Sequence, residues 1–502
     1  MTLSRVVHAG KGVVASEHPL ASQAGCDALK AGGNAFDAAV ATSFALAVTS
    51  HHIGGLGGDF FVTFYEAATG KVRCLNSSGW APSGLTAELL RSKGESQVPQ
   101  SGPMSCVIPG QVAGVWEMHR RHGSLDFGKL LAPAAAYASD GFPASEGFSA
   151  SIAVAWDQLT PGARRVFSGD GQAPPPGAWI RQEALGRVID EVARGGTDAF
   201  YRGWPAEEAR AVLEAMGVPA SPGDFRDFSP EWVEPLSAHY RGRRVYETPP
   251  NSMGATTLLM LEMLSKEDLS KHGPLSAERV RSTMEAAEVA YERKDRLLGD
   301  PRFGKVDMAA FMEPPKGAGA YAGEVRGGDT TAFSVADEKG NVVSAIQSLF
   351  RHFGSRVFVP ACGIILNSRA AGFRGDGPNR VEPRKRPLHT LSSLIVEAGP
   401  DRLVAMGVSG GEYRPLQHTL LVTNLVDYGM TLERAVDHQR FLWSEGRDLV
   451  VEEGYSLPPG GRYSVKPQPL PGKTGVCQAA EALPRLRKGV CDVRGDGIPA
   501  GY

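Results

Sequence analysis

The sequence lacks any long apolar run and any excess of charge of one sign. No stretch reaches the roughly 18 apolar residues that a transmembrane helix needs, and residues 1–20 contain no apolar run of signal-peptide length. The formal net charge of −2 over 502 residues gives no field that would attract nucleic acid or an anionic membrane. We therefore expect a cytoplasmic protein that binds neither nucleic acid nor a membrane.

Sequence patterns for metals, redox cysteines and nucleotides are missing too. The six cysteines form no CxxC pair and are expected to be buried thiols, although the sequence leaves open whether Cys477 and Cys491 bond. No HExxH and no carboxylate–histidine cluster is present, so we expect no metal and no cofactor. The glycine-rich segment 54–58 precedes a strand-like segment rather than a helix, which disfavours a dinucleotide site. No G-x-S-x-G elbow marks a serine nucleophile.

Glycine and proline are plentiful, with 61 and 35 residues, and they are interspersed among apolar periodic segments. This predicts an ordered chain with many tight turns, the plainest loop being 161–179. Helices are expected over most of 108–230 and at 19–49, 254–265, 276–298, 415–428 and 431–438. Strands are expected at 59–66, 71–76, 239–250, 356–366, 392–397 and 402–408. The mixture favours an α/β (α+β) class with antiparallel sheets between layers of helices.

One predicted hairpin carries a candidate nucleophile. In GGDTTAFSVADEKGNVVSAIQSLF (327–350), apolar and polar residues alternate on either side of a glycine-bearing turn. A threonine hydroxyl needs a base, and the α-amino group of Thr330 would serve if the chain were cut just before it. Such an amino group has a pKa of about 7.7–8.0, which suits proton transfer near neutral pH. Taken alone, an ordinary structural hairpin remains the simpler interpretation, because threonine is common in strands.

The remainder of the chain decides between these interpretations. Several runs carry a resemblance to one known family: HPLASQAGCDALKAGGNAFDAAVATSFALAV, GGLGGDFF, YRGRRVYETPPNSMGATTLLML, YERKDRLLGDPRF, DTTAFSVADEKGNVVSAIQSLFRHFGS and GVSGGE. Over nearly its whole length the sequence resembles the γ-glutamyltranspeptidase family of N-terminal-nucleophile hydrolases. The resemblance implies a four-layer αββα sandwich of two antiparallel sheets. It also implies a precursor that cuts itself between Asp329 and Thr330. The products, 1–329 and 330–502, would stay together in one structural domain, as a heterodimer that could dimerise further.

The same resemblance assigns the catalytic residues. Thr330 matches the nucleophile, and Thr331 follows it and could hydrogen-bond near the active hydroxyl. Ser348 stands where the family commonly has a threonine that supports the nucleophile. Gly410 and Gly411 match a glycine pair whose N–H groups form an oxyanion hole. The implied reaction is acyl transfer from a small-molecule amide to Thr330, followed by release of the acyl group to water or to an amine.

The pocket for a glutamyl head group departs from the family pattern. Ser78 falls where the transpeptidases have an arginine, Phe350 where an asparagine is expected, and Gly372 where an acidic residue is expected. His389-Thr390 replaces a pair of serines. A substrate charge left unpaired in a partly buried site costs free energy, so an ordinary γ-glutamyl substrate is disfavoured.

Arg369 offers a different cation, because it lies just before Gly372 and could bind a carboxylate through two parallel hydrogen bonds. We expect Arg369, His389, Thr390 and Ser78 to contact the substrate. The alternatives are that Arg369 forms a surface ion pair and that His389 is a packed core histidine. The forms NSRAAGF and RPLHT are similar to the branch that includes oxamate amidohydrolases and γ-glutamyltransferase-like proteins.

The sequence therefore predicts a self-processing hydrolase or acyltransferase for a γ-glutamyl-type or other small carboxylate-bearing amide, with hydrolysis favoured. One alternative is a true γ-glutamyltranspeptidase or glutathione hydrolase. Another is a non-catalytic binding protein that kept the fold, although the retention of Thr330, Ser348 and the glycine pair disfavours it.

Overall fold

Two antiparallel sheets, each of seven strands, lie face to face in the computed structural model. It describes residues 5–168, 171–313, 321, 323, 325, 327–444, 448–455, 463–472 and 474–502. The first sheet has the order β1 (Arg5–Ala9), β20 (Leu486–Cys491), β19 (Cys477–Leu483), β15 (Arg402–Val408), β14 (Leu394–Gly399), β9 (Arg243–Glu247) and β8 (Leu236–Tyr240). The second has the order β21 (Ala500–Gly501), β2 (Val13–Ser16), β10 (Asp329–Ala336), β11 (Val342–Phe350), β3 (Asp59–Glu66), β4 (Lys71–Ser77) and β7 (Glu231–Val233).

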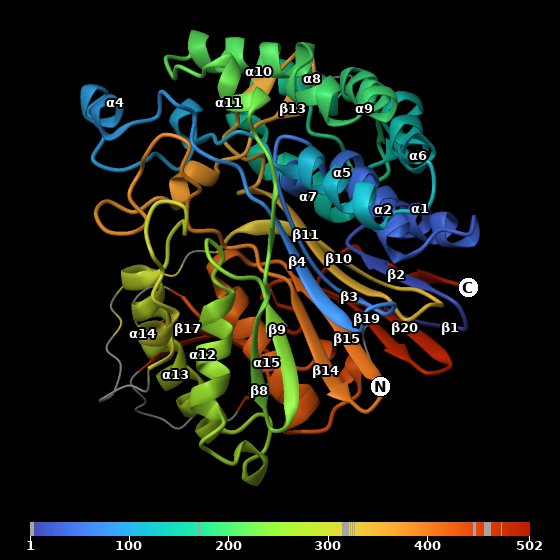
Figure 1. Ribbon diagram of the computed structural model, residues 1–502, viewed down its shortest axis with the longest axis vertical. Coiled ribbons are helices and arrows are strands. Elements are labelled where there is room, and N and C mark those ends of the chain that lie inside the picture. Colours follow the sequence, from blue (N-terminus) through green and yellow to red (C-terminus); the bar gives the residue numbers. More distant parts are fainter. Residues whose placement is uncertain are drawn as a thin grey trace.

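Helices cover both outer faces of the pair of sheets (Figure 1). On the second sheet lie α1 (Pro19–Lys30), α2 (Ala35–Thr49), α3 (His51–Gly54), α5 (Gln111–His122), α6 (Phe127–Asp140) and α9 (Glu183–Tyr201), with α4 (Ala87–Ser92), α7 (Glu146–Ala155), α8 (Pro161–Phe167), α10 (Trp204–Ala215) and α11 (Pro222–Arg226) further out. On the first sheet lie α12 (Gly254–Leu264), α13 (Ala277–Leu297), α14 (Met308–Met312), α15 (Arg414–Val426) and α16 (Leu432–Asp437). The expected αββα sandwich is confirmed.

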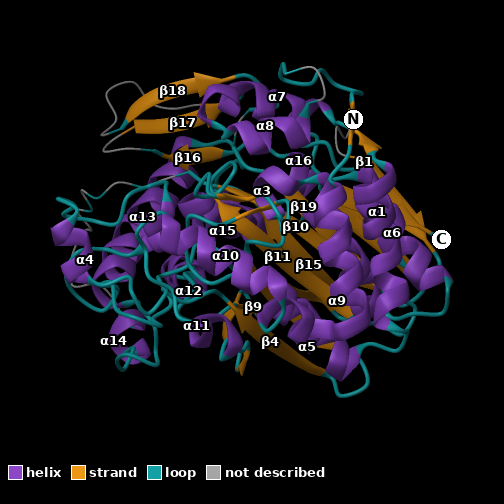
Figure 2. Ribbon diagram, turned by 90° about the horizontal axis from the view of Figure 1, so that it is seen from above, coloured by secondary structure: helices purple, strands orange, loops and turns teal. Residues whose placement is uncertain are grey.

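The short elements lie at the margins of the sandwich. They are the strands β5 (Phe142–Pro143), β6 (Trp179–Ile180), β12 (Phe358–Val359), β13 (Ile364–Ile365), β16 (Phe441–Trp443), β17 (Asp448–Glu452) and β18 (Ser464–Gln468) and the 3₁₀ turns at 103–105, 156–158, 269–271, 369–372 and 411–413. Figure 2 shows β16, β17 and β18 as a separate small sheet beside the main layers.

Helix α2 shows how the sequence builds the central helical layer. The Asn34 side chain accepts hydrogen bonds from the N–H groups of Phe36 and Asp37, and the Asp37 carboxylate accepts one from Asn34 N–H, which fixes the start of the helix. Every residue of α2 is buried, and most are small. An alanine-rich helix of this kind can pack against helices and strands on all sides, and α2 contacts α1, α5, α6, β10 and β11.

Small residues also let the two sheets approach closely. A Cβ atom on Gly407 of β15 would lie 2.7 Å from Cβ of Ala332 on β10, which is too close for two carbon atoms. Alanine dominates the neighbouring apolar cluster that joins the sheets, which contains Ala9, Val13, Tyr246, Ala336, Val342, Ile395, Ala405, Ala480 and Ala482. Strand β10, which carries the candidate nucleophile Thr330, is thus held tightly between a helical layer and the opposite sheet.

Some local expectations need correction. Residues 161–167 form α8 rather than a loop, because the Thr160 hydroxyl accepts a hydrogen bond from Ala163 N–H and Pro161 suits the first helical turn. The expected strand at 356–366 is confined to β12 and β13. Most of the glycine-rich segment 313–328 lies outside the described residues.

All six cysteines are buried and unbonded. Within the described residues, no helix has the length and hydrophobicity to cross a membrane.

Candidate active site

The start of β10 carries a β-bulge at the candidate nucleophile. Asp329 pairs with Phe350 and Thr331 pairs with Gln347, so the register shifts between Asp329 and Thr331 and leaves Thr330 in the irregular position. A bulge re-aims the side chain that it carries. Thr330 is 2 % exposed. Phe350, opposite the bulge, has a positive φ of 80°, a conformation that residues with a side chain rarely adopt.

The Ser348 hydroxyl connects the nucleophile to the bond that precedes it. It accepts a hydrogen bond from Thr330 Oγ1 (3.2 Å) and one from Phe350 N–H (2.7 Å). It donates its own proton to the backbone carbonyl of Asp329 (2.9 Å). These contacts use its donor and both of its lone pairs, so the direction of its proton is fixed. One side chain therefore orients the Thr330 hydroxyl and polarises the carbonyl group beside it.

Gly410 and Gly411 lie where β15 passes into α15, and both have positive φ, 129° and 60°. A Cβ atom on Gly411 would overlap Gly328 N and lie 2.8 Å from Gly328 Cα. Only glycine fits this close approach. The structure therefore brings Gly411, with Gly410 beside it in sequence, against the chain immediately before Asp329, which is where an oxyanion hole for cutting at that residue would have to lie.

Thr331 points to the other side of the strand. A Cβ atom on Gly54 of α3 would overlap the Thr331 side chain, so this side chain faces the helical layer. Its hydroxyl is buried and lies near the Glu17 carboxyl, but it forms no hydrogen bond of ordinary geometry among the described residues. Among the described residues, Thr331 does not form the expected hydrogen bond near the Thr330 hydroxyl.

Arg369 and His389 meet at the buried carboxylate of Asp59. Asp59 Oδ2 lies 3.0 Å from His389 Nε2 and 3.3 Å from Arg369 Nε, and all three side chains are fully buried. Burial and the nearby Arg369 cation lower the pKa of His389 to about 3, so its ring is neutral at pH 7. Its Nδ1 accepts from Leu391 N–H, which leaves Nε2–H to donate to Asp59. His389 thus has the contacts of a core histidine, and the ion pair of Arg369 is buried rather than at the surface.

Phe350 covers this buried ion pair. The Arg369 guanidinium lies 4.1 Å from the centre of the Phe350 ring, and its Nη1 donates to Thr390 Oγ1 (3.0 Å). Ser78 is fully buried and accepts a hydrogen bond from the Asn251 amide (3.1 Å). Ser78 and Arg369 are therefore packed behind the site in this conformation.

Of the five positions that depart from the family pattern, all but Ser78 line one pocket. Phe350, Gly372, His389 and Thr390 all contribute to it, together with Met253, Lys294, Asp295, Arg374, Leu388 and Glu412. The four charged residues of this set were missed by the sequence analysis. YERKD and GGE, which contain three of them, matched the family only as part of longer runs, and nothing in these runs indicates a shared pocket.

The charges in this pocket are paired with one another. Arg374 Nη2 lies 2.7 Å from Glu412 Oε1. Lys294 Nζ lies 3.0 Å from Asp295 Oδ1 and 3.6 Å from Glu412 Oε2. Since Glu412 follows Gly411, the pocket lies next to the glycine pair. Within the described residues, no group of three or more histidine, cysteine or acidic side chains is placed to hold a metal ion.

Glu17 is a fifth residue that the sequence analysis missed. It follows β2, the strand beside β10, and its carboxyl lies near the Thr331 hydroxyl and the Ala332 backbone. The side chain is half-buried and its Oε2 atom is fully buried. Burial, opposed by the contact with Thr331, raises the pKa of Glu17 from 4.5 to about 8. The carboxyl is therefore largely protonated at pH 7.

Replacing Glu17 by glutamine should remove a pH dependence of stability. Because its pKa is raised on folding, Glu17 contributes stability below pH 4.5 that is lost as the pH rises through about 8. We expect Glu17→Gln to match the wild type at pH 5 and to exceed its unfolding free energy at pH 9 by about 1 kcal/mol or more. Thermal unfolding at both pH values measures this. The exposed Glu88→Gln is the control, and parallel pH profiles for wild type and Glu17→Gln would contradict the assignment.

Comparison with known proteins identifies the family. A family model described as gamma-glutamyltranspeptidase matches residues 21–502. The chain belongs to the γ-glutamyltranspeptidase family. Among the relatives of this γ-glutamyltranspeptidase-family chain is the glutathione hydrolase-like YwrD proenzyme of Bacillus subtilis, 34 % identical over 99 % of this chain and 100 % of that protein. Another is the oxamate amidohydrolase proenzyme of Klebsiella pneumoniae, 30 % identical over 89 % of this chain and 88 % of that protein.

A solved structure agrees with this assignment. The cephalosporin acylase from Bacillus halodurans superimposes with a TM-score of 0.91 and 31 % identity, covering 99 % of this chain and 97 % of that chain. As a member of the γ-glutamyltranspeptidase family, the protein is a self-processing amide hydrolase or acyltransferase, made as a proenzyme that yields two chains of a heterodimer.

Proposed function

We propose that the protein cuts itself between Asp329 and Thr330 and then hydrolyses a small carboxylate-bearing amide, with Thr330 as the nucleophile and water as the preferred acceptor. The observation that carries this proposal is the Ser348 hydroxyl, which binds both Thr330 Oγ1 and the Asp329 carbonyl. A nucleophile and the carbonyl oxygen of its target bond are thereby held on one small side chain, the arrangement that an attack on this bond requires.

In the first stage, Thr330 Oγ attacks the carbonyl carbon of Asp329. The C–N bond between Asp329 and Thr330 breaks, and the Thr330 nitrogen takes up the hydroxyl proton as it becomes an amine. Water then hydrolyses the resulting ester. The products are the chains 1–329 and 330–502, and the second begins with a free amine beside the free Thr330 hydroxyl.

In the second stage, the same hydroxyl attacks the amide of a substrate. The Thr330 amine accepts the hydroxyl proton and passes it to the leaving amine as the C–N bond breaks. N–H groups of Gly410 and Gly411 stabilise the negative oxygen of the intermediate. Water deacylates the ester and regenerates Thr330. Packing by Phe350, Arg369 and His389 shapes the pocket beside the acyl group.

γ-Glutamyl transfer is the second candidate function. The pocket that contains Phe350 holds the cations Lys294 and Arg374 as well as the acids Asp295 and Glu412. A head group that bears both an ammonium and a carboxylate group needs both signs of charge. Hydrolysis of a simpler acid amide remains favoured, because these cations are already paired with the acids.

Two measurements on the wild-type protein test the proposal. Denaturing electrophoresis with intact mass should show two fragments whose junction lies at Thr330. Ammonia release from carboxylate-bearing primary amides should exceed amine release from a γ-glutamyl anilide. A chain that stays whole after long incubation would contradict the cut site, and stronger activity on the anilide would favour the second candidate.

A further inference from the structure

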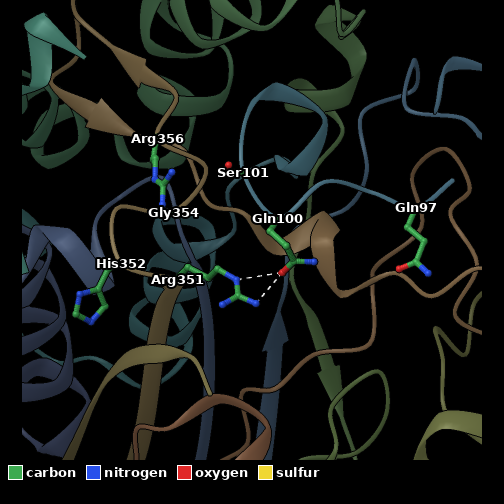
Figure 3. A pocket seen from close by; sticks show the side chains of 7 residues that line it. All are labelled: Gln97, Gln100, Ser101, Arg351, His352, Gly354 and Arg356. Atoms are coloured by element: carbon green, nitrogen blue, oxygen red, sulfur yellow. Dashed lines mark hydrogen bonds between the residues drawn. The ribbon is translucent and has the colours of Figure 1, made fainter. Parts of the chain in front are cut away.

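A second pocket, on the polar loop after β11, is rich in hydrogen-bond donors. Its lining residues are Gln97, Gln100, Ser101, Arg351, His352, Gly354 and Arg356 (Figure 3). They include two guanidinium groups and an imidazole, and the described lining residues include no carboxylate. Arg351 donates two hydrogen bonds to Gln100 Oε1, of 3.1 Å and 2.7 Å, drawn as dashed lines in Figure 3. The chemistry of this lining suits an anion.

The loop that presents these side chains has an unusual and firmly held backbone. Phe350, Phe353, Gly354 and Arg356 all have positive φ, between 52° and 80°. Backbone hydrogen bonds hold it: Phe353 N–H donates to His52 O (2.7 Å), and Ser355 O accepts from Gly102 N–H (2.8 Å). Strained conformations of this kind persist where the surrounding structure holds them, and they cluster at binding sites.

One carboxylate reaches this pocket from the candidate cut site. His352 Nε2 lies 2.8 Å from Asp329 Oδ2, and both side chains are partly open to solvent, 39 % and 48 % exposed. Asp329 is also the residue whose backbone carbonyl accepts the Ser348 proton. During self-cutting, the acyl group that is transferred to Thr330 is therefore that of Asp329, with its side-chain carboxylate held by His352.

We propose that His352, with Arg351 and Arg356 beside it, binds the free carboxylate of the substrate's acyl group after the chain is cut. This inference rests on the proposed function and adds to it a prediction of how many carbons the acyl group of the substrate contains. In Asp329 the carboxylate is separated from the reacting carbonyl by Cα and Cβ, which is the spacing of a succinyl group. The preferred substrate is thus a monoamide of a four-carbon dicarboxylic acid, and it occupies the place that Asp329 holds before cutting.

Hydrolysis of such a substrate needs no reagent other than water. Thr330 Oγ attacks the amide carbon, the C–N bond breaks, and the amine leaves with the proton that the Thr330 amine received. Water then releases the dicarboxylate. In oxamate the carboxylate is bonded directly to the amide carbonyl carbon, so it cannot reach His352 while that carbonyl lies at Thr330.

The test is a series of primary amides hydrolysed by the processed enzyme. Oxamate, malonamate, succinamate and glutaramate place none, one, two and three carbons between carboxylate and amide, and butanamide is the neutral match for succinamate. We expect kcat/KM for ammonia release to be greatest for succinamate. His352→Gln should lower this value by about 10- to 100-fold, as expected for loss of a charge-assisted hydrogen bond. Its kcat/KM on butanamide should stay within about twofold of the wild type's, because no carboxylate is bound.

Because His352 contacts Asp329 before the cut, its replacement can change the fraction of protein that is cut. Rates are therefore expressed per mole of free Thr330 amino terminus, measured by intact mass. Should His352→Gln stay uncut, Arg356→Gln makes the same comparison, and the exposed Arg194→Gln on α9 is the matched control. An optimum at oxamate or glutaramate, or an equal loss on succinamate and butanamide, would overturn the inference and leave the proposed function standing. Absence of any cut in the wild type would instead overturn the proposed function.

Discussion

Thr330→Ala should remain a single polypeptide and should lose amide hydrolysis by more than about a thousandfold. In the proposed mechanism, the substitution removes the hydroxyl that attacks Asp329 and, because no cut follows, it also prevents formation of the free amine that acts as base. Both stages depend on the same oxygen atom. Intact mass over several days and ammonia release from succinamate measure the two losses.

Thr330→Ser is the matched variant, because it keeps the hydroxyl and removes only a methyl group. It should still be cut and should retain measurable hydrolysis. If Thr330→Ala were cut at the same bond, or hydrolysed amides at the wild-type rate, another residue would be the nucleophile.

Ser348→Ala should slow self-cutting by about 10²- to 10³-fold, the usual effect of removing one donor to a developing oxyanion. Its hydroxyl lies 2.9 Å from the Asp329 carbonyl oxygen and fixes the Thr330 hydroxyl at 3.2 Å. Ser348→Thr keeps the hydroxyl and should restore much of the rate. The measurement is the conversion of purified precursor to fragments, followed by intact mass against time.

Ser344 provides a close control on the same strand. It is fully buried, and its hydroxyl donates to the Met406 carbonyl at 2.9 Å, far from the cut site. Ser344→Ala loses a buried hydrogen bond of the same kind and should cut at nearly the wild-type rate. Equal slowing in both variants would show that Ser348 acts through stability of the strand rather than on the carbonyl.

The sequence predicted the hairpin of Thr330 and Ser348 because its signals are local: alternating residues, a glycine turn and a polar entrance. The sandwich was predictable because matches to one family run along the whole chain. The buried contact of Asp59 with Arg369 and His389 was not, because it joins residues more than 300 positions apart and no local pattern encodes such a pairing. For the same reason Glu17, Lys294 and Glu412 were missed as neighbours of the site.

The prediction of a loop at residues 161–167 was wrong for a different reason. Proline and glycine at the start of this segment were interpreted as turn signals, whereas proline also suits the first turn of a helix that a threonine caps. His352 illustrates a third limit. A histidine in a loop after a strand is unremarkable in sequence, and its interest lies in a distance to Asp329 that depends on the β-bulge.

The order of strands has a consequence for how the mature protein can unfold. In the second sheet the neighbouring strands β10 and β11, which follow the Asp329–Thr330 bond, are flanked by β2 and β3, which precede it. In the first sheet, β1 pairs with β20 and β9 pairs with β14, so the two parts of the chain share both sheets. A cut at that bond turns a unimolecular folding reaction into an association of two chains. Neither fragment could leave without exposing unpaired strand edges, which favour aggregation. Refolding of the cut enzyme should therefore depend on protein concentration, whereas refolding of uncut Thr330→Ala should not.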